Sequence, residues 1–314
     1  MKRDANIELY RCLLTFGIVI LHVIGFYGKE WHWLSSMFVW CVPGFVFITG
    51  YFGIKFSVAK ILRLYGICMW CFPVSIAVGQ SGTGGGVVDI LRTAWTAFLG
   101  NWFVHAYVGL MMLAPVIDAA LEPLKKSKHI RDMVPVFAPF LFFVFVWSFL
   151  SNYNCVSQFV AKAPSCEVLT LLGIYTIARV FRICEFESKV SLQLAIVLFA
   201  VGVGLATLRI GKFNSLLSIA ITIGGFVWCR RIRLNEFCKK VVLFSAPSMF
   251  SIFLIHANSW CLNSMHRYVD VVAGYGVPKI MSFFIVAVVV FVSGLLLDIP
   301  RRFVVWCTMH KFHK

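Results

Sequence analysis

The chain has 314 residues, of which 60% are hydrophobic and only 13% are charged, and its formal net charge is +16. Its mean hydropathy of +0.87 lies well above the balance of a soluble globular domain. This composition excludes an ordinary soluble protein and indicates an integral membrane protein.

Apolar runs that are long enough to cross a bilayer recur along the whole chain. An apolar α-helix needs roughly 20 residues to span a hydrocarbon core of about 30 Å. The runs are continuous rather than alternating, which argues against a β-barrel and predicts an all-α, polytopic membrane helix bundle. We expect about ten transmembrane helices, at residues 7–26, 35–54, 62–79, 102–121, 133–150, 167–184, 190–208, 213–229, 242–262 and 280–299.

The connections between these runs are too short to form soluble domains. The longest of them, residues 80–101 and 151–166, fall on the expected outer side of the membrane. The sequence shows neither an internal repeat of fixed period nor the paired, interrupted helices of many transporters. We therefore expect a single integral-membrane domain over residues 1–314.

Alternate connections carry most of the basic residues, and this distribution explains the positive charge. Clear examples are the pairs Lys2 and Arg3, Lys125 and Lys126, Arg230 and Arg231, Lys239 and Lys240, and Arg301 and Arg302. The positive-inside rule places these connections, and with them both termini, in the cytoplasm. The charge therefore indicates topology rather than nucleic-acid binding, with anionic lipid or an anionic cytoplasmic ligand as its partner.

Within the first apolar run, the stretch RCLLTFGIVILH begins with Arg11 and ends with His22. Eleven residues of α-helix rise about 16 Å and turn about 1,100°, so both side chains face the same way. Glu8 lies three residues before Arg11 on the same stripe, within reach of an ion pair. Because ionisable groups inside a membrane nearly always face the bundle interior or an aqueous cavity, we expect a polar tunnel here. The alternative is that Arg11 extends to the inner interface and His22 makes one hydrogen bond within the core.

Six segments of the chain resemble landmarks of one known family, in the same order. ELYR (8–11), followed by His22, resembles the arginine, ten residues, histidine motif on the first helix of the membrane-bound acyltransferase 3 family. Thr49 and Phe253 stand where that family usually has serine and tyrosine. The other five segments are PGFVFITGYF (43–52), KILRLY (60–65), NWFVHAYVGLMMLAPVID (101–118), LLGIYTIARVFR (171–182) and FSIFLIHANSW (250–260).

This resemblance implies a membrane-bound O-acyltransferase. Such an enzyme moves an acyl group, usually acetyl from acetyl-CoA, to a sugar hydroxyl of a cell-envelope polysaccharide or glycolipid. The implied partners are acyl-CoA, an envelope glycan or lipid-linked sugar, and the lipid bilayer, with neither nucleic acid nor metal. The implied location is the bacterial inner membrane, which the chain crosses several times. A polytopic transporter or flippase for a lipid-linked saccharide is the alternative.

Arg11 and His22 are the predicted catalytic residues. Attack by a sugar hydroxyl on a thioester needs a base, and imidazole titrates close to working pH. His22 would act as that base or, instead, as a nucleophile that is transiently acylated. With Arg11, Lys60 and Arg63 at the cytoplasmic end of the third predicted helix would form a mouth for the phosphates of acyl-CoA. The alternative is that these basic residues reflect only the positive-inside topology.

Three further residues are predicted to contact substrate or support the pair. His256, in the segment FLIHAN, would contact substrate or orient His22 through a hydrogen bond, and the alternative is a purely structural histidine with its hydrogen bonds satisfied. Tyr107 would line the acceptor side of the site. Glu8, as the partner of Arg11, completes the predicted substrate-binding residues.

Overall fold

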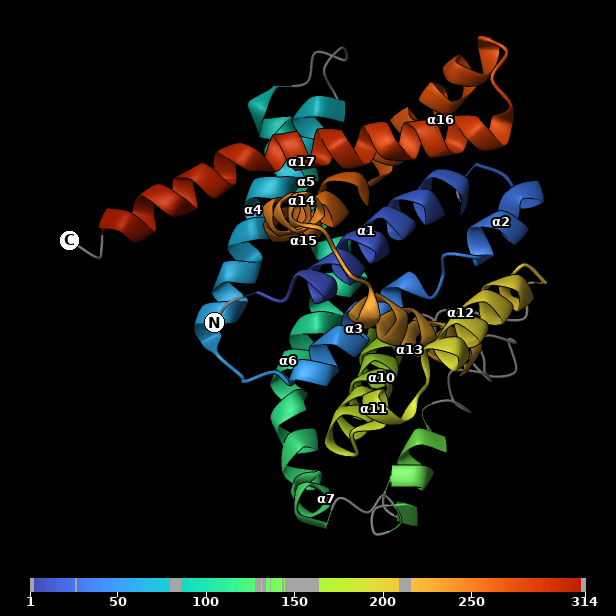
Figure 1. The fold of residues 1–314 in the computed structure, drawn as a ribbon. Helices are drawn as coiled ribbons and strands as arrows, with labels where there is room; N and C mark the ends of the chain where they lie inside the picture. Colours follow the sequence, from blue (N-terminus) through green and yellow to red (C-terminus); the bar gives the residue numbers. More distant parts are fainter. Residues whose placement is uncertain are drawn as a thin grey trace, which may run out of the picture. The chain divides into compact units, whose positions relative to one another are not determined.

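The computed structural model describes residues 3–25, 27–79, 86–127, 164–208 and 216–311, together with residues 131, 134–135, 137–142 and 144. Every regular element in this part of the chain is a helix, which confirms the predicted all-α class (Figure 1). The chain forms two compact units. The first contains residues Met1–Phe38, Leu62–Gly100 and Arg233–Lys314, and the second contains Val39–Ile61 and Asn101–Ile232. The prediction of one domain over 1–314 stays a prediction.

The first unit is built around α1, Ala5–Gly25. Asp4 starts this helix, because its Oδ1 atom accepts a hydrogen bond from the backbone N–H of Asn6 at 3.0 Å. In Figure 1, α1 (blue) runs alongside α17 (red). The unit also contains η1 (Lys29–Trp31), α2 (His32–Ser36), most of α4 (Val58–Gly79), α5 (Val87–Gly100), α14 (Glu236–Ser245), η3 (Ala246–Ser248), α15 (Met249–His256), α16 (Ser259–Gly274) and α17 (Lys279–Lys311).

Helices α1, α15, α16 and α17 share one hydrophobic core. Buried side chains from all four helices meet in this core. Where the helices lie outside the bilayer, the removal of apolar surface from water is the main force that holds them together. Within the bilayer the same close packing contributes dispersion contacts instead. The buried residues of this core include Val19, Val23, Ile252, Met265, Phe283 and Val286.

The second unit is centred on α10, Pro164–Ile183, which packs against α3 and α6. Gly50 in α3 lets the two backbones approach closely, because a Cβ there would lie 2.7 Å from the carbonyl oxygen of Tyr175. Gly53, at φ +77°, then ends α3. The helices of this unit are α3 (Cys41–Phe52), α6 (Trp102–Ala120), α7 (Glu122–Ser127), α10, α11 (Phe186–Lys189), α12 (Leu192–Ala206) and α13 (Leu216–Arg231).

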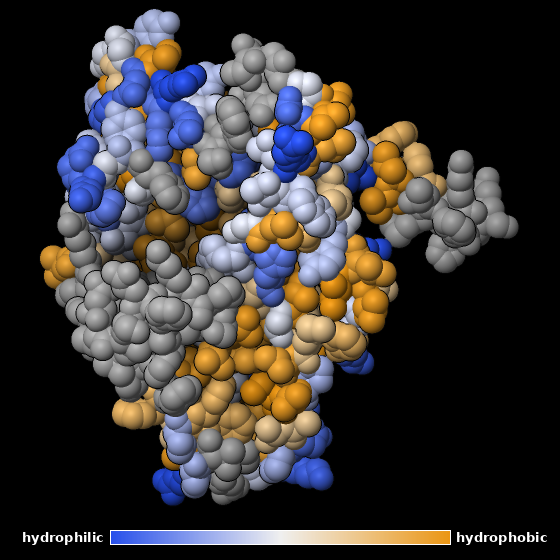
Figure 2. Space-filling view, turned by 180° about the vertical axis from the view of Figure 1, so that it is seen from behind, coloured by the Kyte–Doolittle hydropathy of each residue, from blue (hydrophilic) through white to orange (hydrophobic). Residues whose placement is uncertain are grey.

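Six segments of the described chain are long and apolar enough to cross a membrane, so the chain is a multi-pass membrane protein. Figure 2 shows a broad area of hydrophobic surface, as expected for helices that face lipid. The six segments are Ala5–Gly25, Lys29–Phe52, Val58–Val78, Trp102–Ala120, Glu236–His256 and Lys279–Cys307.

The remaining predicted spans are not among these six segments. Predicted spans 190–208 and 213–229 correspond to α12 and α13, which have only 15 and 16 residues. Predicted span 167–184 corresponds to α10, and most of 133–150 lies outside the described residues. The number of ten spans and the cytoplasmic position of the termini stay predictions.

Two helices lie where the sequence analysis expected connections. Residues 80–101 contain α5, and most of α16 falls after the predicted span 242–262, which itself is interrupted where Asn258 caps α16. Each of these helices buries a pair of apolar residues four positions apart, Ala94 with Phe98 and Met265 with Val269. This 3.6-residue periodicity indicates an amphipathic helix, which a search for continuous apolar runs does not detect.

Candidate functional site

Two histidines that are distant in sequence meet inside the first unit. His22 lies in the last turn of α1, and His256 is the last residue of α15. Nδ1 of His22 is 3.0 Å from Nε2 of His256, although 234 positions separate them. His256 is buried, with 1% of its surface exposed, whereas His22 is partly buried. The structure thus brings together two of the residues that the sequence analysis selected.

A backbone carbonyl determines which ring nitrogens of this pair carry hydrogen. Nδ1 of His256 lies 2.6 Å from the carbonyl oxygen of Ile252. Because a carbonyl oxygen only accepts, this Nδ1 is the donor, and in a neutral imidazole the other nitrogen is then an acceptor. Nε2 of His256 therefore accepts from Nδ1–H of His22. The lone pair of a neutral His22 is consequently on its Nε2 atom, which is the form that a general base needs.

Glu8 and Arg11 form the ion pair that their spacing predicts. The Nη1 atom of Arg11 donates to Oε1 of Glu8 at 2.8 Å. The Glu8 side chain is almost fully buried, and its Oε2 atom has no hydrogen-bond partner within the described part of the chain. Arg11 is more exposed and carries five N–H donors, so it can keep this ion pair while it binds an anion. The polar tunnel from Arg11 to His22 stays a prediction.

The other predicted site residues are divided between the two units. Arg63 lies on the part of α4 that belongs to the first unit, whereas Lys60 and Tyr107 belong to the second. Nζ of Lys60 donates to the carbonyl oxygen of Lys55 at 3.1 Å. The hydroxyl of Tyr107 lies 3.4 Å from Oγ1 of Thr49. The structure therefore groups Glu8 with Arg11, and His22 with His256, and it tests no role of Lys60, Arg63 or Tyr107.

A cavity of about 320 Å³ has His256 in its wall. It is formed by α15, α16 and α17, together with Val78 near the end of α4. Most of its lining is aliphatic. The sequence analysis did not predict this cavity, because its walls depend on how α15, α16 and α17 pack against one another, which the hydropathy of each helix does not reveal.

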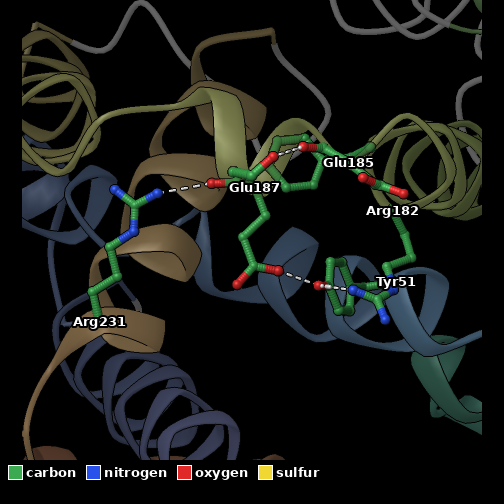
Figure 3. A pocket seen from close by; sticks show the side chains of 7 residues that line it. Tyr51, Arg182, Glu185, Glu187 and Arg231 are labelled. Atoms are coloured by element: carbon green, nitrogen blue, oxygen red, sulfur yellow. Dashed lines mark hydrogen bonds between the residues drawn. The ribbon is translucent and has the colours of Figure 1, made fainter.

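The second unit contains a polar pocket of about 340 Å³ (Figure 3). Its centre is Glu187, whose carboxylate accepts a hydrogen bond from the Tyr51 hydroxyl and pairs with Nε of Arg230 at 3.0 Å. Figure 3 shows Arg182 on the other side of that hydroxyl, to which its Nη1 donates at 2.8 Å. Arg231 donates to the backbone carbonyl of Glu187 at 2.8 Å. The three arginines are therefore held around Glu187, Arg230 by its carboxylate, Arg231 by its backbone carbonyl and Arg182 through Tyr51.

The sequence analysis interpreted these arginines as part of the topology signal, with anionic lipid or an anionic cytoplasmic ligand as partner. The signal that it missed is the acidic segment CEFESK, which places Glu185 and Glu187 directly after the basic end of α10. Glu185 adopts a left-handed backbone conformation, with φ at 55°, which is uncommon for a residue other than glycine. This conformation turns the chain from α10 into α11, which brings Glu187 to the arginines.

Comparison with known proteins finds a family match that covers nearly the whole chain. A family model described as an acyltransferase domain matches residues 4–304. The match includes both histidines and all helices from α1 to the greater part of α17. A comparison with curated proteins and a comparison with solved structures find no match.

Proposed function

The chain belongs to the acyltransferase 3 family, and from this premise we propose that it transfers an acyl group, expected to be acetyl, from acyl-CoA to a sugar hydroxyl of a cell-envelope polysaccharide or glycolipid. Membership makes the chain a membrane-bound O-acyltransferase. We place it in the bacterial inner membrane, with both termini in the cytoplasm. The observation that carries the proposal is the hydrogen-bonded pair of His22 and His256.

His22 is the proposed general base. Its Nε2 atom takes the proton of the acceptor hydroxyl, while its Nδ1–H stays bound to His256. That contact fixes the ring orientation and stabilises the imidazolium that forms. If His22 acted as a nucleophile instead, the same Nε2 atom would carry the acyl group, and a burst of acyl-enzyme would precede steady turnover.

Arg11 is the proposed anchor for the anionic end of the donor. Its ion pair with the buried Glu8 fixes the guanidinium near the start of α1, and its planar fork suits a phosphate. Lys60 and Arg63 are exposed in the first two turns of α4, three positions apart and so on one face of the helix. Tyr107, whose hydroxyl lies beside Thr49, is proposed to contact the acceptor.

The His22→Ala variant tests the assignment. We expect purified protein to lose transfer from labelled acetyl-CoA by roughly 10²–10⁴-fold, the usual contribution of a general base. His32→Ala, which removes another partly buried histidine of the first unit, is the matched control and should keep its activity. Unchanged transfer in His22→Ala would refute the role of this residue.

Mass spectrometry of surface glycans tests the reaction in cells. Glycans from cells with the wild-type chain should carry one acyl group more than those from cells with His22→Ala. Movement of a lipid-linked sugar without any acyl-CoA, equal in both strains, would instead support the transporter or flippase alternative.

A further inference from the structure

The cavity beside His256 connects a buried polar group with the apolar surface of the first unit. At its deep end, His256, Ile255 and Met265 are each no more than 6% exposed. At its mouth, Tyr268 is 62% exposed and Val289 is 57% exposed. A molecule can therefore reach His256 from the surface formed by α16 and α17.

The chemistry of the lining favours a hydrocarbon chain. Among the described residues that line the cavity, none is charged, and most are valine, isoleucine, leucine or methionine. Such walls offer no partner for the phosphates of a nucleotide and few for the hydroxyls of a sugar ring. The polar side chains are few: Cys261, Ser264, Tyr268 and Ser293, together with His256 at the deep end.

The dimensions and depth of the cavity agree with a hydrocarbon chain that enters from the bilayer. Its lining along α17 runs from Ile285 to Leu297, which is about 18 Å of helix. Lys279 is the first residue of a candidate membrane span, and Val289 lies ten positions after it. Val289 is therefore about 15 Å along the helix from the start of the span. This depth is close to the middle of a hydrocarbon core of about 30 Å. The mouth of the cavity thus lies at the depth expected for the acyl chains of a bilayer.

We propose that this cavity holds the aliphatic chain of a membrane-resident acceptor, which enters sideways from the bilayer and brings its hydroxyl-bearing head to His256 and His22. This inference rests on the proposed function and names the acceptor class: a lipid-carried saccharide rather than a free polysaccharide. The hydrocarbon chain gains by staying in an apolar environment, while the head reaches the proposed base.

Photocrosslinking tests occupancy of the cavity without any need for turnover. The full chain is placed in phosphatidylglycerol nanodiscs with an alkyl glycoside that carries a diazirine in its long chain. We expect adducts on the lining residues of α16 and α17. An excess of the unlabelled long-chain glycoside should remove them, and the methyl glycoside, which has no chain, should not.

A matched pair of variants makes this test specific. Val289→Trp places a bulky ring at the mouth and should reduce labelling at least tenfold. Val288→Trp changes the neighbouring valine, which is 48% exposed but does not line the cavity, and should leave labelling unchanged. Equal labelling in the two variants would overturn the proposal. Competition by a long-chain acyl-CoA but not by the alkyl glycoside would assign the cavity to the donor and overturn it equally.

Failure of this inference is distinguishable from failure of the proposed function. If the wild-type chain transfers acyl groups, and Val289→Trp transfers them as fast as Val288→Trp, the acceptor site is elsewhere and the enzyme assignment stands. If the cavity binds the alkyl chain specifically while no acyl transfer occurs, the cavity stands as a lipid-chain site and the proposed reaction is wrong.

Discussion

His256 makes two hydrogen bonds, and together they determine the tautomer and the orientation of His22. The carbonyl oxygen of Ile252 fixes the hydrogen of His256 on Nδ1, and the remaining Nε2 then accepts from His22. Both contacts are made at short distance in a buried environment, where an unsatisfied polar group is costly. His256 is therefore a positioning residue, and it acts on the reaction through His22.

A pair of His256 variants separates positioning from simple packing. We expect His256→Ala to lower kcat by about 10–100-fold, the usual cost of losing an orienting hydrogen bond to a reactive histidine, with little change in KM for acyl-CoA. His256→Gln should recover part of the rate, because its Oε1 atom can accept from Nδ1–H of His22. Steady-state kinetics on both variants checks this. Equal rates in the two variants would show that His256 only fills space.

The geometry of this pair could not be predicted from the sequence. The arginine–histidine spacing on the first helix is local, so helical geometry alone orients Arg11 and His22. The contact between His22 and His256 depends instead on how α1 packs against α15, and the periodicity of neither helix contains that information. The sequence analysis accordingly left three roles open for His256: substrate contact, orientation of His22 and a purely structural hydrogen bond.

At the scale of elements, the close contact of α3 with α10 depends on one glycine. A Cβ at position 50 would lie 2.7 Å from both the carbonyl oxygen of Tyr175 and the Cβ of Ala178. Neither atom belongs to a flexible side-chain end, so any added group must push the helices apart. Small residues at helix–helix contacts are a general means of close packing in membranes.

Gly50→Ala should therefore destabilise the second unit by about 1–3 kcal/mol, the usual cost of overpacking. The matched control is Gly204→Ala in α12, where no atom lies within 4 Å of an added Cβ. That variant should be neutral or stabilised by up to about 1 kcal/mol, because alanine favours helix more than glycine does. Thermal unfolding in detergent compares the two. Equal unfolding temperatures would contradict the close approach of α3 and α10.

Helix existence was predictable where apolar runs are continuous, and not where a helix is amphipathic. The long runs of α1, α6 and α17 were predicted because each is apolar over most of its length. Helices α5 and α16 carry polar residues between their buried ones, so they resemble connections when only mean hydropathy is considered. Their short apolar stripes would have been found by a search for residues four positions apart.

A polar cluster in α16 makes the contact of this helix with the start of α17 sensitive to pH. The carboxylate of Asp270 accepts hydrogen bonds from Nζ of Lys279 at 2.8 Å and from the hydroxyl of Tyr27. The hydrogen bond from Lys279 makes the largest contribution to lowering the pKa of Asp270, and the hydrogen bond from Tyr27 makes the next largest. The folded state therefore favours the ionised carboxylate. Its stabilising contribution is present above the ordinary Asp pKa of about 3.9 and is lost as the pH falls through the lower folded pKa.

Asp270→Asn should reveal this contribution as a pH-dependent difference. We expect the wild type to unfold at a higher temperature than Asp270→Asn throughout the range from pH 8 to pH 5. The difference should shrink as the pH approaches 3, because the wild-type carboxyl then becomes neutral too. Thermal unfolding over this pH range measures it. A difference that grows toward low pH would have the wrong sign for this cluster.

At the scale of the whole molecule, the distribution of charge predicts a definite orientation in the membrane. Cys238 lies in the exposed first turns of α14, next to the basic residues Lys239 and Lys240. Tyr275 follows α16, 84% exposed, on the side that the sequence predicts to be outside. The positive-inside rule places Cys238 in the cytoplasm. This orientation would also put the start of α1, with Arg11, on the side where acyl-CoA is available.

Cysteine labelling tests that orientation. In a background without the other native cysteines, one variant keeps Cys238, and another combines its removal with Tyr275→Cys. A membrane-impermeant maleimide should label the Tyr275→Cys variant in intact spheroplasts, and should label Cys238 only after permeabilisation. The reverse pattern would invert the topology and place Arg11 away from the donor. Labelling of both positions from one side would contradict a membrane crossing between them, although Glu236–His256 is one of the candidate spans.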